Sequence, residues 1–105
     1  MSNPILSIVA TFLLLTIAPA ATEHVVTQKD KNFSHSTLTM RSGDTIVLKN
    51  EDPVVHNVFA KSEVVTFNAM QDPGDETKIT VETTGTFVVR CAIHPKMKLR
   101  VEVKE

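Results

Sequence analysis

The stretch from Cys91 to Met97 constrains the fold of this chain more than any other. It places Cys91, His94 and Met97 at intervals of three. Apolar residues alternate with other residues on both sides of it, at Phe87, Val89, Leu99, Val101 and Val103. Because successive side chains of a strand point to opposite faces, each run predicts a strand with one buried face. We therefore expect two strands joined by a tight loop, with Cys91 ending the first and Met97 beginning the second.

The same three side chains are of types that bind metal ions, and they differ in the oxidation state of copper that they favour. The thiolate of Cys91 and the thioether of Met97 stabilise Cu(I), whereas the imidazole of His94 suits both oxidation states of copper. A distant histidine would complete the shell, and His56 is the best candidate. Two imidazoles and one thiolate with a weak axial thioether describe a blue-copper site, which holds one copper ion as Cu(I) or Cu(II). The predicted metal ligands are His56, Cys91, His94 and Met97.

Each of these four residues could also have an ordinary structural role. Taken singly, Cys91 and Met97 would be ordinary core residues and His94 a solvated one. His56 also has two competitors. We expect His35 at the surface or edge of a strand, and His24 would complete an N-terminal copper or nickel clamp if a leader were cleaved after residue 21.

The rest of the chain predicts an all-β domain with short strands. Turn signals occur at residues 42–44, 50–53, 72–75 and 84–85. The strands expected between them are His24–Gln28, Ser34–Met40, Thr45–Lys49, Asn57–Ala60, Glu63–Phe67, Lys78–Glu82, Thr86–Arg90 and Lys98–Lys104. This spacing favours a Greek-key β-sandwich of about seven to eight strands.

An almost wholly apolar run, residues 5–17, lies near the start and is followed by small residues at 18 and 20. It predicts a signal peptide over residues 1–20 and a single domain over residues 21–105. We expect export, to the periplasm or out of the cell, and no stable membrane insertion after cleavage. The first four residues carry no Lys or Arg, so an uncleaved membrane anchor is the competing interpretation, although the run is shorter than the roughly 20 residues of a spanning helix.

Charge and cysteine content narrow the function. The formal net charge is −1, which argues against a nucleic-acid binder that relies on bulk charge. Cys91 is the only cysteine, so an intramolecular disulfide is impossible. A lone thiol is a liability in an oxidising compartment, and ligation of copper would remove that difficulty.

Three stretches together resemble the cupredoxin family, and within it the amicyanin and plastocyanin group. Ser42–Asn50 resembles the Gly-Asp turn and strand ahead of the family's first histidine ligand, which His56-Asn57 would supply. Cys91–Met97 is similar to the amicyanin loop, with two residues between histidine and methionine. The resemblance implies that residues 21–105 form a cupredoxin-like copper-binding domain.

That resemblance also implies a function. We expect a small secreted blue-copper electron carrier, not an enzyme, which shuttles single electrons between redox proteins such as a c-type cytochrome or a dehydrogenase. The partners would dock near the ring of His94, and we expect a monomer. The expected docking patch consists of Val54, Val55, Met70 and Pro95. Basic residues nearby predict a partner with acidic residues around its docking site; they are Lys96, Lys98 and Arg100.

The resemblance assigns roles to two asparagines as well. Asn50 would hydrogen-bond the Cys91 loop through its side chain, and the backbone amide of Asn57 would donate to the Cys91 sulfur. Such donors orient ligands and tune a metal.

Two other functions stay open. A copper chaperone or copper-storage protein would use the same soft ligands without a tight geometry. A zinc enzyme could use Cys91, His56 and His94 with an open water position, but no general base stands beside the motif and the methionine would be idle. The chain lacks the further histidine clusters of a multicopper oxidase and the second cysteine of a c-type haem site.

Overall fold

The computed structural model describes residues 8–15 and 20–105. Most of the predicted signal peptide therefore lies outside the described residues. Residues 8–15 form no helix or strand, and their large apolar side chains are 78–91% exposed. The described ranges contain no helix that is long and apolar enough to cross a membrane. Cleavage after residue 20 stays a prediction.

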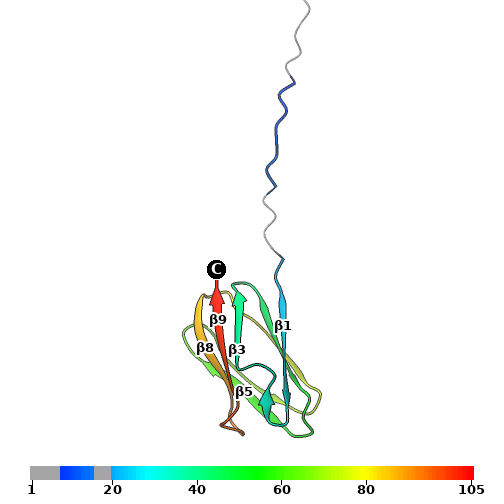
Figure 1. The fold of residues 1–105 in the computed structure, drawn as a ribbon, viewed down its shortest axis with the longest axis vertical. Helices are drawn as coiled ribbons and strands as arrows, with labels where there is room; N and C mark the ends of the chain where they lie inside the picture. Colours follow the sequence, from blue (N-terminus) through cyan, green and yellow to red (C-terminus); the bar gives the residue numbers. More distant parts are fainter. Residues whose placement is uncertain (1–7, 16–19) are drawn as a thin grey trace, which may run out of the picture.

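Nine strands form two sheets in the described part of the chain (Figure 1). The first sheet has the order β2-β1-β4-β7 and consists of β1 (Glu23–Lys29), β2 (Asn32–Phe33), β4 (Thr45–Asn50) and β7 (Glu76–Thr80). The second has the order β3-β9-β8-β5-β6 and consists of β3 (Thr37–Arg41), β5 (His56–Lys61), β6 (Thr66–Gln71), β8 (Gly85–Cys91) and β9 (Lys98–Lys104).

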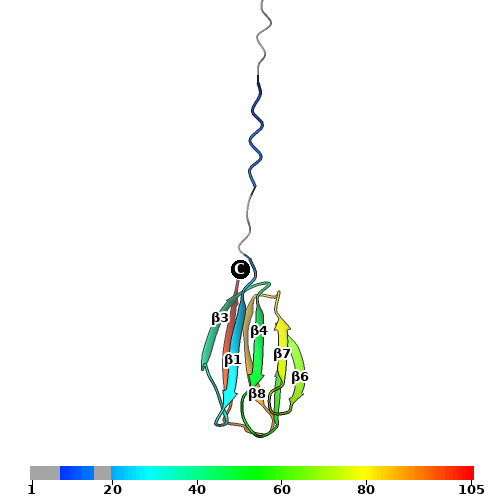
Figure 2. The same ribbon diagram turned by 90° about the vertical axis from the view of Figure 1, so that its right-hand side faces the viewer.

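The sheets are mixed and pack as a sandwich, which confirms the predicted fold class. In Figure 2, β1, β4 and β7 of the first sheet lie side by side. The pairs β1·β4 and β3·β9 are parallel, while the remaining pairs are antiparallel. The strand count exceeds the expected number because the chain also forms the two-residue β2.

Strand bounds follow the alternating pattern closely where one face is buried. β9 has the predicted bounds, β4 is one residue longer at its end, and β1, β5 and β8 are one residue longer at both ends. The predicted strand Glu63–Phe67 is wrong, since β6 begins only at Thr66. The hydroxyl of Ser62 accepts hydrogen bonds from the Val64 and Val65 amides, and this turn delays the strand.

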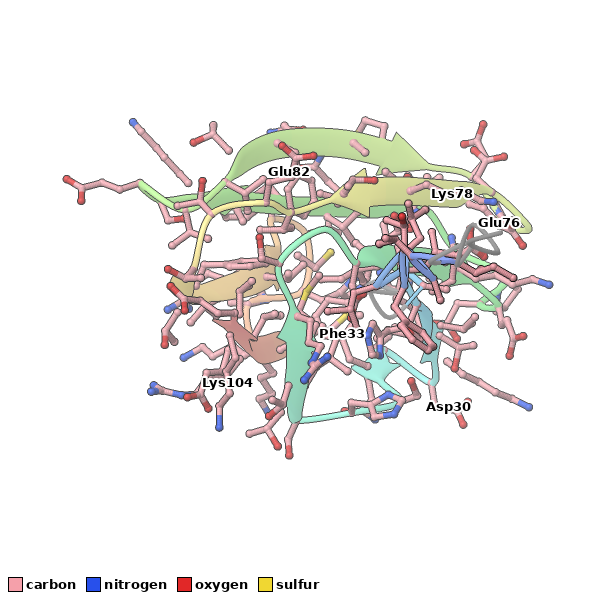
Figure 3. All side chains as sticks on the ribbon, turned by 90° about the horizontal axis from the view of Figure 1, so that it is seen from above. Asp30, Phe33, Glu76, Lys78, Glu82 and Lys104 are labelled. Carbon is pink, nitrogen blue, oxygen red and sulfur yellow. The ribbon has the colours of Figure 1, made fainter. Side chains whose placement is uncertain are left out.

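The core lies between the sheets and contains the residues that alternation predicted. Phe87, Val89, Cys91, Met97, Leu99, Val101 and Val103 are all at most 3% exposed. Viewed from above, side chains fill the space between the sheets, while charged side chains such as Glu76 and Lys104 lie at the outside (Figure 3). These rows of buried side chains fix which face each ligand candidate points to.

The two ends of the sandwich carry different parts of the chain. Figure 1 shows the end of β9 and the start of β1 at one end, and the loop between β8 and β9 at the other. The second end also carries the connection between β4 and β5 and the turn between β1 and β2. The candidate ligands of the sequence analysis gather at this end.

Candidate metal centre

Strand pairing brings His56 and Cys91 together although they are 35 residues apart in sequence. β5 and β8 are antiparallel neighbours, and Cys91 lies opposite Val58. Because side chains alternate, His56 shares a face with Val58 and therefore with Cys91. Both side chains are buried, with residue exposures of 0% and 2%.

The loop after β8 turns His94 back toward this pair. The amide of Ala92 donates to the Asn57 carbonyl at 2.9 Å, and the amide of Met97 donates to the His94 carbonyl at 2.9 Å. These two hydrogen bonds fix the loop at its beginning and its end. His94 is half-buried and lines a surface hollow beside Lys31 and Lys96.

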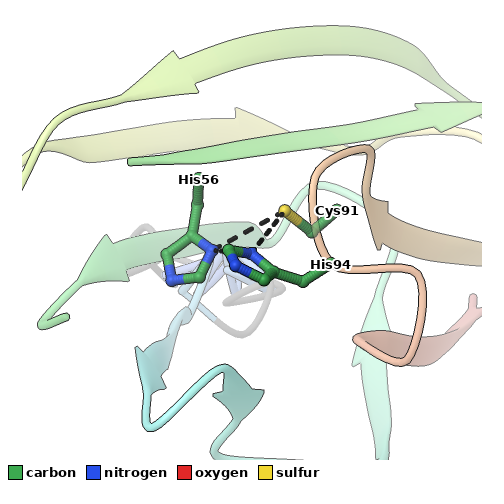
Figure 4. Close-up of side chains that lie close together, drawn as sticks. All are labelled: His56, Cys91 and His94. Atoms are coloured by element: carbon green, nitrogen blue, oxygen red, sulfur yellow. Dashed lines mark hydrogen bonds between the residues drawn. The ribbon is translucent and has the colours of Figure 1, made fainter. Parts of the chain in front are cut away.

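Three donor atoms form a compact triangle in this structure (Figure 4). His56 Nδ1 and His94 Nδ1 are 3.1 Å apart, and Cys91 Sγ lies 3.6 Å from the first and 3.7 Å from the second. A point about 2 Å from all three atoms exists at the centre of such a triangle, close to the ~2.0–2.3 Å of metal–nitrogen and metal–sulfur bonds. The triangle therefore fits one metal ion in trigonal coordination.

Met97 lies directly after the loop and before β9. It is 2% exposed, as its position in the alternating series predicts. The structure brings His56, Cys91 and His94 into one cluster. The role of Met97 as a fourth, axial ligand stays a prediction.

A backbone donor also reaches the sulfur. The amide of Asn57 lies 3.4 Å from Cys91 Sγ, which confirms the contact expected from the family resemblance. A hydrogen bond to a ligating thiolate draws electron density from the sulfur and tunes the metal it binds.

The contact predicted for Asn50 is wrong. Its side-chain amide donates to the carbonyls of Val54 and Gln71, at 2.8 and 3.1 Å, and its oxygen accepts from the Asp52 amide at 2.9 Å. Asn50 thus organises the loop that leads to His56 rather than the loop that carries Cys91. The prediction failed because the side chain of Asn50, buried at the end of β4, finds its partners in the β4–β5 connection and at the end of β6.

Asp52 is a site residue that the sequence analysis missed. Its Oδ2 lies 2.7 Å from His56 Nε2, on the side of the ring away from the donor triangle. Burial alone would raise the pKa of Asp52, but hydrogen bonds from His56 and from the Lys31 and Asp30 amides outweigh it and lower that pKa. The one available signal was a carboxylate four residues before the candidate ligand.

The sequence of this chain matches the family model for the cupredoxin-like domain over residues 4–101. The chain belongs to the cupredoxin-like domain family. No curated protein matches it significantly in sequence.

Solved structures share the fold of this cupredoxin. Amicyanin from Paracoccus versutus is 24% identical with a TM-score of 0.70, over 85% of this chain and 86% of that one. A reduced amicyanin mutant is 25% identical with a TM-score of 0.71, over 85% and 87% of the two chains. The Cu-containing nitrite reductase from Thermus scotoductus SA-01 is 24% identical with a TM-score of 0.72, over 85% of this chain but only 23% of the enzyme. The cupredoxin therefore spans most of an amicyanin and less than a quarter of that nitrite reductase.

The surroundings of the half-buried His94 lower its pKa and so favour its neutral imidazole. Burial lowers the pKa of His94, and the nearby charges of His56 and Lys31 lower it further, against an opposing effect of Asp52. A neutral imidazole is the form that binds a metal. The two histidine rings meet edge to face, with centroids 4.9 Å apart.

The other two histidines lie outside the cluster. His24 Nε2 pairs with Asp44 at 3.0 Å, and His35 Nδ1 contacts the hydroxyl of Ser34 at 2.8 Å. His24 belongs to β1, where it is paired in register with Ile46. Among the described residues, His56 is therefore the histidine that completes the site.

Proposed function

We propose that this cupredoxin is a blue-copper electron carrier that holds one copper ion with His56, Cys91, His94 and Met97. The observation that carries the proposal is the triangle of two imidazole nitrogens and one thiolate sulfur. This donor set, with a weak axial thioether, matches blue-copper electron-transfer sites. When bound, the copper supplies the exchange of one electron between Cu(I) and Cu(II).

The chain contributes a shell that is already assembled. His56 begins one strand and Cys91 ends its neighbour, so paired backbone fixes both. A shell on rigid elements changes little between two oxidation states, and little rearrangement favours fast electron transfer. A copper chaperone, in contrast, gains from ligands that open easily.

His94 provides the path to a partner because it is the half-buried member of the triangle. Exposed apolar side chains occur at the same end; Val54, Met70 and Ile93 are 38%, 64% and 49% exposed. We propose this surface, with exposed Pro95, as the docking site of a redox protein such as a c-type cytochrome or a dehydrogenase. Lys31 and Lys96 line the hollow beside His94, which favours a partner with acidic residues at its own docking site.

Export completes the proposal. Residues 1–20 would direct the chain to the periplasm or out of the cell, and residues 21–105 would act there as a monomer. Copper storage or copper transfer remains the second candidate, because it would use the same ligands.

Voltammetry of the copper-loaded protein tests this function. We expect one reversible one-electron wave, with copper retained through repeated cycles. Met97→Leu should shift the midpoint potential because the axial ligand tunes it. Met40→Leu is the matched control, since Met40 is equally buried in the core and Leu conserves its volume. An irreversible wave with rapid loss of Cu(I) to a competing chelator would favour the chaperone instead.

A further inference from the structure

The hydrogen bond between Asp52 and His56 determines which ring nitrogen faces the donor triangle. Asp52 Oδ2 and His56 Nε2 are 2.7 Å apart, and both side chains are almost fully buried. An ionised carboxylate only accepts hydrogen bonds, so Nε2 must carry the proton. His56 Nδ1 then offers its lone pair toward Cys91 Sγ and His94 Nδ1.

The carboxylate is itself held from a second direction. Its Oδ1 accepts the Asp30 amide at 2.5 Å, and its Oδ2 accepts the Lys31 amide at 3.0 Å. The backbone amide of Asp52 donates to Asn50 Oδ1 at 2.9 Å. With these contacts Asp52 has little freedom to turn away from His56.

The β1–β2 turn adopts an unusual backbone to make these contacts. Asp30 and Lys31 have φ angles of 52° and 57° and are the non-glycine residues with positive φ in the described ranges. Two-residue hairpin turns of this kind favour Asn-Gly, because a β-carbon strains the left-handed conformation. Such strain persists where the surroundings impose it, and here two successive N–H groups enclose one anion.

We propose that Asp52 is a positioning residue of the metal site, and that the Asp30–Lys31 turn acts on His56 through it. This inference rests on the proposed function and extends it to a turn far from the ligands in sequence. The turn fixes the carboxylate, the carboxylate fixes the tautomer and direction of the His56 ring, and the ring meets the metal without reorganising. Loss of such a supporting contact typically weakens metal binding about 10–100-fold.

Asp52→Asn separates this role from mere packing. The Asp30 amide, which makes the shorter of the two turn contacts, would hold the oxygen of the new side chain, and the amino group would take the place of Oδ2, where it can no longer accept the Lys31 amide. That amino group would then point at His56 Nε2 and favour the opposite tautomer, with the proton on Nδ1. Glu51→Gln is the matched control, since it removes the same charge from an exposed neighbour whose side chain makes no hydrogen bond in the described structure.

The readouts are nitrogen NMR of His56 in the full chain, without metal and with Cu(I), and Cu(I) affinity by competition with a chelator. We expect the Nε2–H tautomer in the wild type and in Glu51→Gln, a switch to Nδ1–H in Asp52→Asn, and a 10–100-fold lower affinity in that variant alone. An Nδ1–H tautomer in the metal-free wild type, or unchanged tautomer and affinity in Asp52→Asn, would overturn the proposal. Failure of the wild type to bind copper, with the tautomer switch intact, would overturn the proposed function but not the role of Asp52.

A second pair of variants tests the turn. Lys31→Gly and Lys31→Val both remove the lysine charge, but only glycine accepts a positive φ without strain. We expect Lys31→Val to bind Cu(I) more weakly than Lys31→Gly, because both variants lose the same charge and only valine strains the turn. Equal affinities in the two variants would contradict the link between the turn and His56.

Discussion

Two buried side-chain amides, one from each sheet, hydrogen-bond to each other close to the candidate metal site. Replacing one or both of them tests how much this contact between the sheets contributes to stability. Gln28 in β1 and Gln71 in β6 are both fully buried. Gln28 Nε2 donates to Gln71 Oε1 at 2.6 Å, and Gln71 Nε2 donates to the Leu48 carbonyl at 2.9 Å and the Thr77 hydroxyl at 2.8 Å. Gln28 Oε1 has no hydrogen-bond partner in the described structure. The strand pairing places Gln71 opposite His56.

The expected free energies follow from which polar atoms each substitution leaves unpaired. Gln71→Leu leaves the whole buried amide of Gln28 without a partner and removes the donor to the Leu48 carbonyl and the Thr77 hydroxyl, so we expect a loss of about 1–3 kcal/mol or more. Gln28→Leu leaves only Gln71 Oε1 without its donor and also removes the unpartnered oxygen, so we expect a loss of about 1 kcal/mol. The double substitution removes both ends of the pair, and we expect it to cost about 1–2 kcal/mol less than the sum of the single ones.

Urea denaturation of the wild type and the three variants, all with the same metal content, measures these changes in the free energy of unfolding. Equal m-values would show that the same surface is exposed in each case. Free energies of unfolding that add within about 0.5 kcal/mol would refute the reasoning, because independent sites behave in that way.

Three further substitutions probe the scaffold. Leu99→Ala, at a fully buried position of β9, should lower the free energy of unfolding by about 2–5 kcal/mol in chemical denaturation. Gly85→Ala should destabilise by about 1–3 kcal/mol in the same assay, because φ is 138° and the added β-carbon would lie 2.8 Å from Val64 Cγ2. Hydrogen bonds, led by the one from the Thr22 amide, lower the pKa of Asp44 from 3.8 to about 2, so the stability it contributes is complete above about pH 4 and is lost as the pH falls through 2. Asp44→Asn should therefore unfold more easily than the wild type at neutral pH, with a difference that shrinks across this window.

Alternation with one buried face made most of the sandwich predictable. β9 was predicted to the residue because Leu99, Val101 and Val103 alternate with charged residues without interruption. The sequence Glu63-Val64-Val65 is equally typical of a strand, yet the Ser62 hydroxyl holds it in a turn. The competition between a side chain and the strand backbone was not visible in the pattern.

The metal site, too, could be predicted only in part. Cys91, His94 and Met97 could be proposed from one short loop, and His56 from its resemblance to a family motif. Asp52 could not, because its role depends on a turn about twenty residues away whose amides reach it only in the folded chain. The role expected for Asn50 failed since a family resemblance carries a residue's position more reliably than its partners.

The metal site itself is tested most directly by absorption and electron paramagnetic resonance spectra after addition of one equivalent of Cu(II). Wild type is compared with Cys91→Ala, and His35→Ala is the control for a histidine outside the cluster. We expect intense charge-transfer absorption toward the red end of the visible range and a small copper hyperfine splitting, both lost in Cys91→Ala and kept in His35→Ala. A pale complex with ordinary square-planar parameters, unchanged in Cys91→Ala, would show that the triangle of His56, Cys91 and His94 does not hold the copper.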